Sequence, residues 1–148
     1  MSETLPFLRR LVSGEAPLPA IARTLGFRIC AVDVGEARLE LDADLERHGN
    51  PLGHVHGGVL ADLADAAMGM ACASTLAAGH SFITIELKMS FMSVVRAGRL
   101  RAIGRVVRSG RTITHVECDI LDAADTLVAR ASSSCLCQPI RAPGARES

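Results

Sequence analysis

The feature that most constrains the fold is a stretch of low charge from Val55 to Ala78. Apolar residues recur along it at helical spacing, at Val59, Leu60, Leu63, Ala64, Ala67, Met68 and Ala71. Small or apolar residues fill most of the remaining positions, and a helix that is apolar on most sides must be surrounded by protein. Asp62 and Asp65 make a membrane span costly. The stretch therefore predicts a long helix inside a soluble domain.

The segments around this helix favour strands. Two apolar runs flank Gly35 before it, and four segments of strand-like pattern follow it. The expected strands are Arg28–Val34, Ala37–Leu41, Ile83–Phe91, Gly98–Arg108, Arg111–Leu121 and Thr126–Cys137. In the third, Ile83, Ile85, Leu87, Met89 and Phe91 alternate with polar residues and predict one buried face. Two strands, a helix and four strands make an α+β layout, in which an antiparallel sheet of five or six strands covers the helix. One helix cannot hide both faces of such a sheet, so either the outer face is polar or another copy covers it, and we expect a homo-oligomer.

The two ends of the chain and one loop carry weaker patterns. Residues 1–26 read as an N-terminal extension with one short helix, Ala20–Leu25, and Asp42–Val55 reads as a loop. Residues 141–148 are polar, and we expect them to be frayed. The 148 residues contain no repeat or linker, so a single domain spanning 1–148 is expected.

Composition excludes several classes of partner. Sixteen basic residues balance sixteen acidic ones, and Trp and Tyr are absent, so neither nucleic acid nor an anionic membrane is an expected partner. Five scattered cysteines without a secretory signal predict free thiols in a reducing cytoplasm. Cys135 and Cys137 share one face of a strand, but no second pair or nearby histidine completes a zinc site, and no metal is expected.

Candidate chemistry begins at His56-Gly57-Gly58, which we expect at the N-terminus of the long helix. The first turn of a helix has unpaired N–H groups and a partial positive charge, and glycine lets a ligand approach the backbone. Such a place can stabilise an oxyanion, where one donor is typically worth ~3–4 kcal/mol. The other interpretation is that the glycines only permit tight packing of the helix on the sheet.

Asp65 lies in the apolar interior of the same helix, where an ionised carboxylate needs a partner. It is either a functional acid or a structural hydrogen-bond acceptor. Asp62, one turn earlier, reads as a solvated or interface residue. Gly57 and Asp65 are eight residues apart, about 12 Å along a helix, so they cannot contact one reacting carbonyl from the same chain. If they act together, a two-fold dimer must bring one to the other.

The segment from Asn50 to Asp65, NPLGHVHGGVLADLAD, closely resembles the signature of hotdog-fold acyl-CoA thioesterases of the phenylacetate-pathway (PaaI) type. In that family the HGG turn begins the central helix, and an acidic residue lies seven positions after the second glycine, where this chain has Asp65. The resemblance covers roughly Phe27 to Leu136. It implies the hotdog fold, an antiparallel sheet of five to six strands wrapped around one long central helix.

The resemblance also implies hydrolysis of an acyl-CoA to a free acid and coenzyme A, without a further cofactor. By analogy, the Gly57 N–H polarises the thioester carbonyl with the help of Asn50. Asp65 of the opposite subunit activates water as a general base or attacks as the nucleophile. Thr84 matches a hydroxyl residue that orients the water in some relatives, and His56 shapes the turn next to the thioester. The expected assembly is a dimer or a dimer of dimers, that is, a homotetramer.

The coenzyme A phosphates need cationic partners, because guanidinium groups match phosphate oxygens in a fork. The candidate substrate-binding residues are Gly58, Arg108, Gly110 and Arg111, with Arg96 and Arg99 as weaker candidates. The acyl group needs an apolar pocket, for which Leu52, Val59 and Met68 are candidates. Neither an aromatic nor an aliphatic acyl group is favoured.

Three other functions stay open. A hydratase or dehydratase of the same fold pairs a histidine with a carboxylate, and His56 and Asp65 supply both types. A non-catalytic module that binds acyl-CoA is the second alternative. A metalloenzyme using His54 and His56 is the third, although it lacks a clear third ligand.

Overall fold

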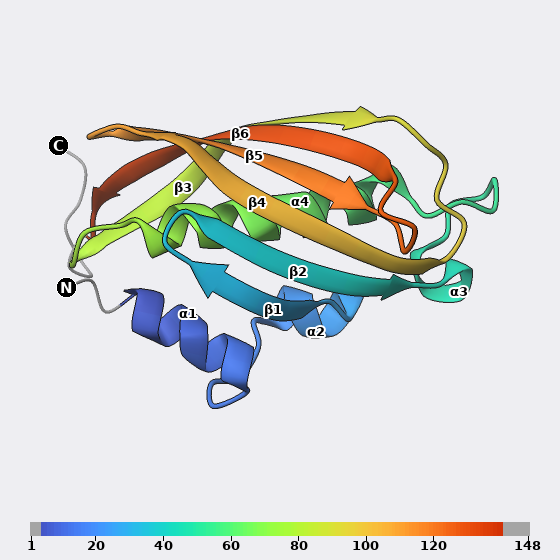
Figure 1. The fold of residues 1–148 in the computed structure, drawn as a ribbon, viewed down its shortest axis with the longest axis horizontal. Coiled ribbons are helices and arrows are strands. Elements are labelled where there is room, and N and C mark those ends of the chain that lie inside the picture. Colours follow the sequence, from blue (N-terminus) through green and yellow to red (C-terminus); the bar gives the residue numbers. More distant parts are fainter. Residues whose placement is uncertain (1–3, 141–148) are drawn as a thin grey trace, which may run out of the picture.

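The computed structural model describes residues 4–140, and within this range the chain forms one antiparallel sheet with helices on one side (Figure 1). The elements in chain order are α1 (Thr4–Ser13), α2 (Ala20–Leu25), β1 (Arg28–Asp33), β2 (Glu36–Ala43), α3 (Leu45–His48), α4 (Gly57–Ser74), β3 (His80–Phe91), β4 (Gly98–Ser109), β5 (Ile113–Leu121) and β6 (Leu127–Pro139). The six strands follow the order β1-β2-β4-β5-β6-β3, with every neighbouring pair antiparallel. The predicted α+β layout of two strands, a long helix and four strands is confirmed.

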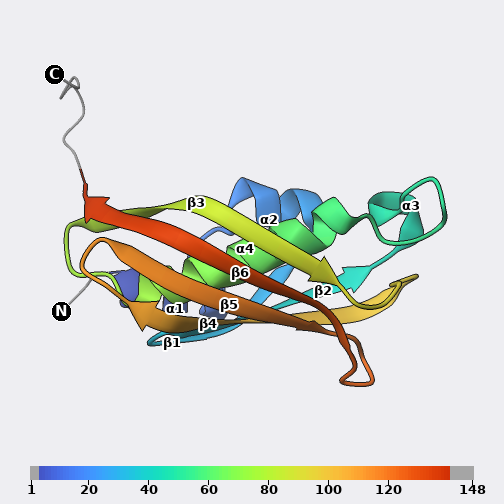
Figure 2. The same ribbon diagram turned by 90° about the horizontal axis from the view of Figure 1, so that it is seen from above.

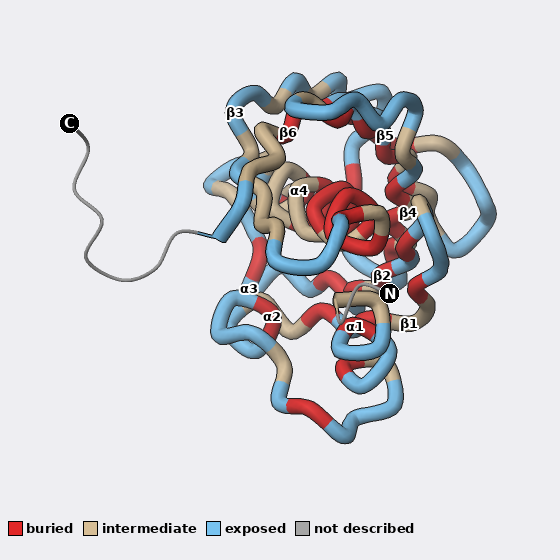
Figure 3. The backbone as a smooth tube through the Cα atoms, turned by 90° about the vertical axis from the view of Figure 1, so that its left-hand side faces the viewer, coloured by how far each residue is buried: buried red, intermediate tan, exposed pale blue. Residues whose placement is uncertain are grey.

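The sheet curves around α4, as the views in Figures 2 and 3 show. Leu63, Ala64, Ala67, Met68 and Ala71 are fully buried on the side of α4 that faces the sheet. The closest approach is at Gly104 of β4, where an added Cβ would lie 2.5 Å from the carbonyl oxygen of Ala67. A residue without a side chain therefore sets the spacing between the sheet and its central helix.

Strand β3 differs from the expected single buried face. A β-bulge leaves Ile85 unpaired, because Thr84 pairs with Cys135 and Glu86 pairs with Ser134. One extra residue inverts the alternation of side chains, so Phe82 packs against the core before the bulge and Leu87 and Met89 pack against it afterwards. Ile83, Ile85 and Phe91 are 52%, 56% and 55% exposed, and the predicted burial of these three residues was wrong.

The N-terminal extension contains two helices where one was expected. Helix α2 has the predicted bounds, and α1 is an additional helix that packs on β1 and α4 through Leu8 and Leu11. The expected loop 42–55 likewise contains a helix, α3, whose first turn is capped by the Asp44 carboxylate accepting from the Arg47 N–H over 2.7 Å. The tail predicted to be frayed, 141–148, lies outside the described residues.

The outer face of the sheet is polar over β5 and β6, where Arg130 and Asp119 form an ion pair. Five of the exposed large apolar side chains lie on the edge strand β3 and just beyond it: Ile83, Ile85, Phe91, Met92 and Val94. We expected the outer face either to be polar or to be covered by another copy, and on β5 and β6 it is polar. Among the described helices, none has both the length and the apolar character required to cross a bilayer.

Candidate active site

The N-terminus of α4 presents one free backbone donor. The His56 side chain caps the helix, with its Nδ1 atom accepting from the Gly58 N–H over 2.9 Å. The His56 N–H itself donates to the His48 carbonyl. Among the described residues, no acceptor is hydrogen-bonded to the Gly57 N–H. The Gly57 amide is therefore available to a ligand at the positive end of the helix dipole, whereas the Gly58 amide is already engaged.

Gly57 is also held against an aromatic ring. An added Cβ at this position would lie 3.0 Å from Cζ of Phe91, at the end of β3. Because the contact is with the far end of a side chain, it restricts how large residue 57 can be but does not require glycine there. The HGG turn and the end of the edge strand thus meet at this corner.

The loop before α4 orients Asn50. Its Oδ1 atom accepts hydrogen bonds from the N–H groups of Leu52 and His54, over 2.9 and 3.1 Å. Its own N–H donates to the His54 carbonyl, which closes the loop. Because Oδ1 is engaged in the loop, the Nδ2 amide is left as the donor that Asn50 can offer to a ligand.

Asp65 is joined to Thr84 in the same chain. The Thr84 hydroxyl donates to Oδ1 of Asp65 over 3.1 Å, and the second carboxylate oxygen stays available. Thr84 is the last residue before the bulge at Ile85, and a bulge next to a site re-aims a side chain. The structural interpretation of Asp65 from the sequence was a hydrogen-bond acceptor, and β3 supplies the donor.

An apolar groove opens beside this pair, between α4, β3 and the two N-terminal helices. Its volume is about 320 Å³. Thirteen residues line it, and only Asp65 and Thr84 among them carry polar side chains. The candidates that the sequence suggested for an acyl pocket lie elsewhere: Met68 is sealed in the core, Leu52 is 78% exposed on the loop, and Val59 does not line the groove.

Asp62 is a further carboxylate that the sequence reading placed in solvent or at an interface. Its Oδ2 atom is buried and has no hydrogen-bond partner in the described part of the chain. Burial, and secondly the charge of Asp65, raise the pKa of the Asp62 carboxyl above its usual value. The prediction that Asp62 is exposed to solvent is therefore wrong for its Oδ2 atom.

Three of the candidate phosphate-binding residues, Arg108, Gly110 and Arg111, lie away from Gly57 in the same chain. Gly110 and Arg111 line a hollow of about 290 Å³ with Leu76 and His80, beyond the C-terminal end of α4. Helix α4 has 18 residues, or about 26 Å of length, between that end and Gly57. Arg108 is exposed near the same hairpin. Within one chain, these residues and the HGG turn are at opposite ends of the central helix (Figure 1).

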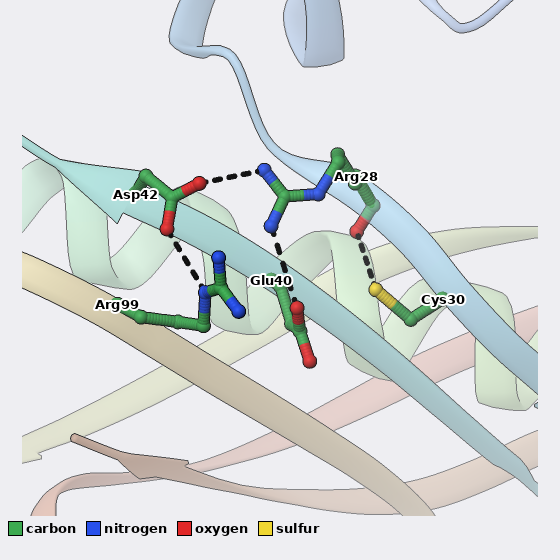
Figure 4. Close-up of polar contacts among 5 residues, drawn as sticks. All are labelled: Arg28, Cys30, Glu40, Asp42 and Arg99. Atoms are coloured by element: carbon green, nitrogen blue, oxygen red, sulfur yellow. Dashed lines mark hydrogen bonds and ion pairs between the residues drawn. The ribbon is translucent and has the colours of Figure 1, made fainter. Parts of the chain in front are cut away.

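Arg99 already has a partner on the outer face of the sheet. Asp42 accepts from Arg28 over 2.8 Å and from Arg99 over 3.0 Å, and Arg28 also reaches Glu40 (Figure 4). These two hydrogen bonds hold the pKa of the Asp42 carboxyl below its usual value. An arginine in this network is a poorer phosphate ligand than a free one, so the structure weakens the case for Arg99.

The cysteines are free thiols, as expected. Cys72 of α4 and Cys137 of β6 bring their sulfur atoms to 3.9 Å, and Cys135 is buried next to them. In the range 4–140, no group of three or more His, Cys, Asp or Glu side chains is arranged to hold a metal ion. His54 and His56 thus gain no third ligand from the described residues.

Comparisons with known proteins identify relatives of this chain. The model of the thioesterase superfamily matches residues 52–129, more than half of the chain. A candidate esterase of Halobacterium salinarum is 37% identical over 106 residues, which cover 69% of this chain and 70% of the relative. The 1,4-dihydroxy-2-naphthoyl-CoA hydrolase of Listeria monocytogenes is 25% identical over 108 residues, covering 73% and 87%.

A solved structure agrees with these relatives. It is a candidate thioesterase from Ralstonia eutropha, described as related to phenylacetic acid degradation. It is 36% identical to this chain, with a TM-score of 0.79 over 88% of this chain and 98% of its own length. The matched part of the chain contains the HGG turn, Asp65 and Thr84. The chain belongs to the thioesterase superfamily, as a hotdog-fold protein of the PaaI type.

Proposed function

We propose that this protein hydrolyses an acyl-CoA thioester to a free acid and coenzyme A at a site shared by two subunits. The observation that carries the proposal is the Asp65 carboxylate, hydrogen-bonded to Thr84 and facing an apolar groove. A carboxylate at the mouth of an apolar groove can act on a bond whose acyl side is buried in that groove. The hydrolases among the relatives support the reaction, and the Listeria hydrolase supports coenzyme A as the thiol.

The chemistry follows from the groups present. Asp65 accepts a proton from water while the water oxygen attacks the thioester carbonyl carbon. The negative charge on the carbonyl oxygen is stabilised by the free Gly57 N–H and the Asn50 Nδ2 amide. When the carbonyl re-forms, the C–S bond breaks, and the coenzyme A thiolate takes the proton from Asp65. If Asp65 attacks directly, the C–S bond breaks as an acyl-aspartyl anhydride forms, and coenzyme A leaves as its thiolate. Water then cleaves the anhydride, which releases the acid, regenerates the Asp65 carboxylate and supplies the proton that the thiolate takes up.

The proposed site needs a second subunit. Gly57 and Asp65 of one chain are about 12 Å apart along α4, too far to contact one carbonyl. The unpaired edge of β3, with Ile83 and Ile85 exposed beside Thr84, is an apolar surface that a second copy can cover. A two-fold axis there gives two equivalent sites, each with Asp65 and Thr84 from one chain and Gly57 and Asn50 from its partner.

The test measures thiol release from a panel of aromatic and aliphatic acyl-CoAs. We expect Asp65→Ala to lower kcat by about 10²–10⁴-fold, the range for losing a general base, while the oligomer and its circular dichroism spectrum persist. Asp33→Ala removes an exposed aspartate that pairs with Arg9 and does not line the groove; it is the control and keeps full activity.

Three outcomes contradict the proposal. An enoyl product without thiol release indicates a hydratase or dehydratase. Acyl-CoA binding that Asp65→Ala leaves unchanged, with no turnover in the wild type, indicates a binding module. Activity that a chelator abolishes indicates a metal-dependent enzyme.

A further inference from the structure

We propose that Cys72 of α4 and Cys137 of β6 form a redox-sensitive dithiol site: hydrogen peroxide oxidises Cys137, and Cys72 then closes a disulfide that joins the helix to the strand. The two sulfur atoms lie 3.9 Å apart, although the residues are 65 positions apart in the sequence. The site is distinct from the apolar groove beside Asp65, whose lining contains no cysteine. Formation of the disulfide is independent of the proposed function, whereas its effect on hydrolysis rests on that function.

The fold places three thiols together between α4 and the sheet. Cys72 is fully buried near the C-terminal end of α4. Cys135 and Cys137 are two residues apart on β6, so their side chains point to the same face of the sheet. Cys135 is also fully buried and is hydrogen-bonded to Cys72. The sulfur atoms of Cys72 and Cys137 need to approach by only about 2 Å to reach the disulfide bond length of about 2.05 Å.

Cys137 is the member of this cluster that a small reagent can reach. It is half-buried and lines the hollow of about 290 Å³ beyond the C-terminal end of α4, whereas Cys72 and Cys135 do not line it. Arg111 lines the same hollow, and the Thr114 hydroxyl lies 3.4 Å from the Cys137 sulfur. Reactive cysteines typically have partly exposed, electropositive surroundings, and this hollow provides both. Hydrogen peroxide therefore meets Cys137 first.

The reaction balances with hydrogen peroxide as the oxidant. The Cys137 sulfur attacks one peroxide oxygen and the O–O bond breaks, which gives a sulfenic acid and one water once the thiol proton moves to the departing oxygen. The Cys72 sulfur then attacks the Cys137 sulfur, the S–S bond forms, the S–O bond breaks, and the hydroxyl leaves with the Cys72 proton as a second water. Two thiols lose two electrons and two protons, and one peroxide becomes two waters.

Cys135 is placed to relay the proton that Cys72 must lose. The hydrogen bond between these two thiols raises the pKa of Cys72, which burial raises further, and lowers the pKa of Cys135. Cys72 therefore keeps its proton in the reduced protein and needs a base when it attacks, and the Cys135 sulfur is hydrogen-bonded to it. We expect Cys135→Ser to slow closure of the disulfide without preventing it.

The disulfide is connected to the proposed catalytic carboxylate through both elements that it joins. Cys72 lies seven residues, or about two turns, after Asp65 on the same side of α4. Cys135, two residues before Cys137, pairs with Thr84 across β6 and β3. The 3.1 Å hydrogen bond between Thr84 and Asp65 has little room to lengthen, because it is lost beyond about 3.5 Å. A shift of up to about 2 Å between α4 and β6 therefore weakens this bond, and we expect kcat to fall.

The first experiment maps the bond in the wild type. The protein is treated with hydrogen peroxide, the remaining thiols are blocked with N-ethylmaleimide in urea, and the chain is cleaved after Lys and Arg. Cys72 is then in the peptide 48–88, and Cys135 and Cys137 are together in the peptide 131–141. We expect these two peptides to be linked with loss of two hydrogens, fragmentation to assign the link to Cys137, and the free thiols to fall from five to three.

The second experiment connects the bond to activity. Peroxide-treated wild type should lose about tenfold in kcat for an acyl-CoA that it hydrolyses, as expected if Asp65 loses the hydrogen bond from Thr84, and dithiothreitol should restore the rate. Cys137→Ser, at a half-buried position, should keep its rate after the same treatment. Cys30→Ser removes the other half-buried thiol, on β1, and is the matched control, which responds to peroxide as the wild type does.

The outcomes separate this inference from the proposed function. Five free thiols after treatment, Cys137 as an unlinked sulfinic acid, or a link to any thiol other than Cys72 overturns the dithiol site. A disulfide between Cys72 and Cys137 that leaves kcat unchanged overturns its effect on Asp65. If the wild type releases thiol from no acyl-CoA, the proposed function fails, and the peptide map still decides whether the dithiol site exists.

Discussion

The Thr84 hydroxyl donates a 3.1 Å hydrogen bond to Oδ1 of Asp65, which joins the edge strand β3 to the middle of α4. This bond fixes one carboxylate oxygen, and the proposed mechanism uses the other to act on water. The helix supplies the acid and the strand sets its orientation, so the reactive geometry depends on the packing between the two elements.

Thr84 is therefore a positioning residue, and its hydroxyl should matter more than its size. Thr84→Val keeps the shape but removes the donor, and we expect kcat to fall by about tenfold, the equivalent of one hydrogen bond of ~1.4 kcal/mol, with little change in KM. Thr84→Ser should restore most of the rate. If valine and serine reduce kcat equally, the residue acts through packing and not through its hydrogen bond.

A site shared between subunits predicts complementation. Asp65→Ala and Asn50→Ala variants are each inactive, but a mixed dimer carries one site with both residues intact. After exchange of subunits at equal amounts, about half of the dimers are mixed, so activity should reach about a quarter of the wild type. A mixture of Asp65→Ala with Asp65→Asn contains no intact site and is the control. No recovery of activity despite demonstrated exchange would mean that each chain holds a complete site.

Asp62 predicts a pH-dependent stability. Its folded-state pKa is raised by burial, so the ionised carboxylate is less favourable in the folded than in the unfolded chain. The penalty is absent below the unfolded pKa of about 3.9 and grows as pH rises through the folded pKa. Asp62→Asn removes this penalty, and we expect its Tm to exceed that of the wild type near neutral pH and to match it in acid.

Thermal unfolding of both proteins across pH measures this difference. A Tm that falls on Asp62→Asn substitution at neutral pH would show that the carboxylate gains a cationic partner in the assembled protein.

Gly104 predicts a large loss of stability on a small substitution. A Cβ there would meet the backbone of α4, 2.5 Å from the Ala67 oxygen, and neither backbone can yield without moving the helix off the sheet. We expect Gly104→Ala to cost about 1–3 kcal/mol, the range for overpacking a core. Gly57→Ala is the matched comparison, because its Cβ meets only the end of the Phe91 side chain, which can turn away. Equal losses of unfolding free energy in urea would show that the helix is not held at this contact.

The sequence predicted the parts of the fold that depend on local pattern. Patterns in consecutive residues predict the apolar helix α4, the HGG turn before it and the four strands after it. The bulge at Ile85 was not predicted, because one unpaired residue inverts the alternation of side chains without changing the apolar composition of the strand. Helix α1 was missed because only Leu8 and Leu11 of its ten residues are fully buried, and Arg9 and Arg10 lie between them.

The candidate site also has a part that the sequence predicted and a part that it did not. Gly57 and Asp65 were singled out from the residues themselves, and Asn50 and Thr84 were named from the family resemblance. The structure joins Asp65 to Thr84 within one chain. The groove was not found, because Phe7, Ile21 and Phe82 come from three separated segments that only the tertiary fold brings together. The roles of the site residues in catalysis stay predictions.

The groove has two walls of different origin. Asp65, Thr84 and Phe82 fall within the residues that match the superfamily, 52–129, whereas Phe7 and Ile21 precede them. Substitutions in the N-terminal segment therefore reshape one wall of the groove without touching the residues that match the superfamily. Chimaeras that exchange residues 4–26 between related proteins would change the shape of this groove while leaving Asp65 and Thr84 in place.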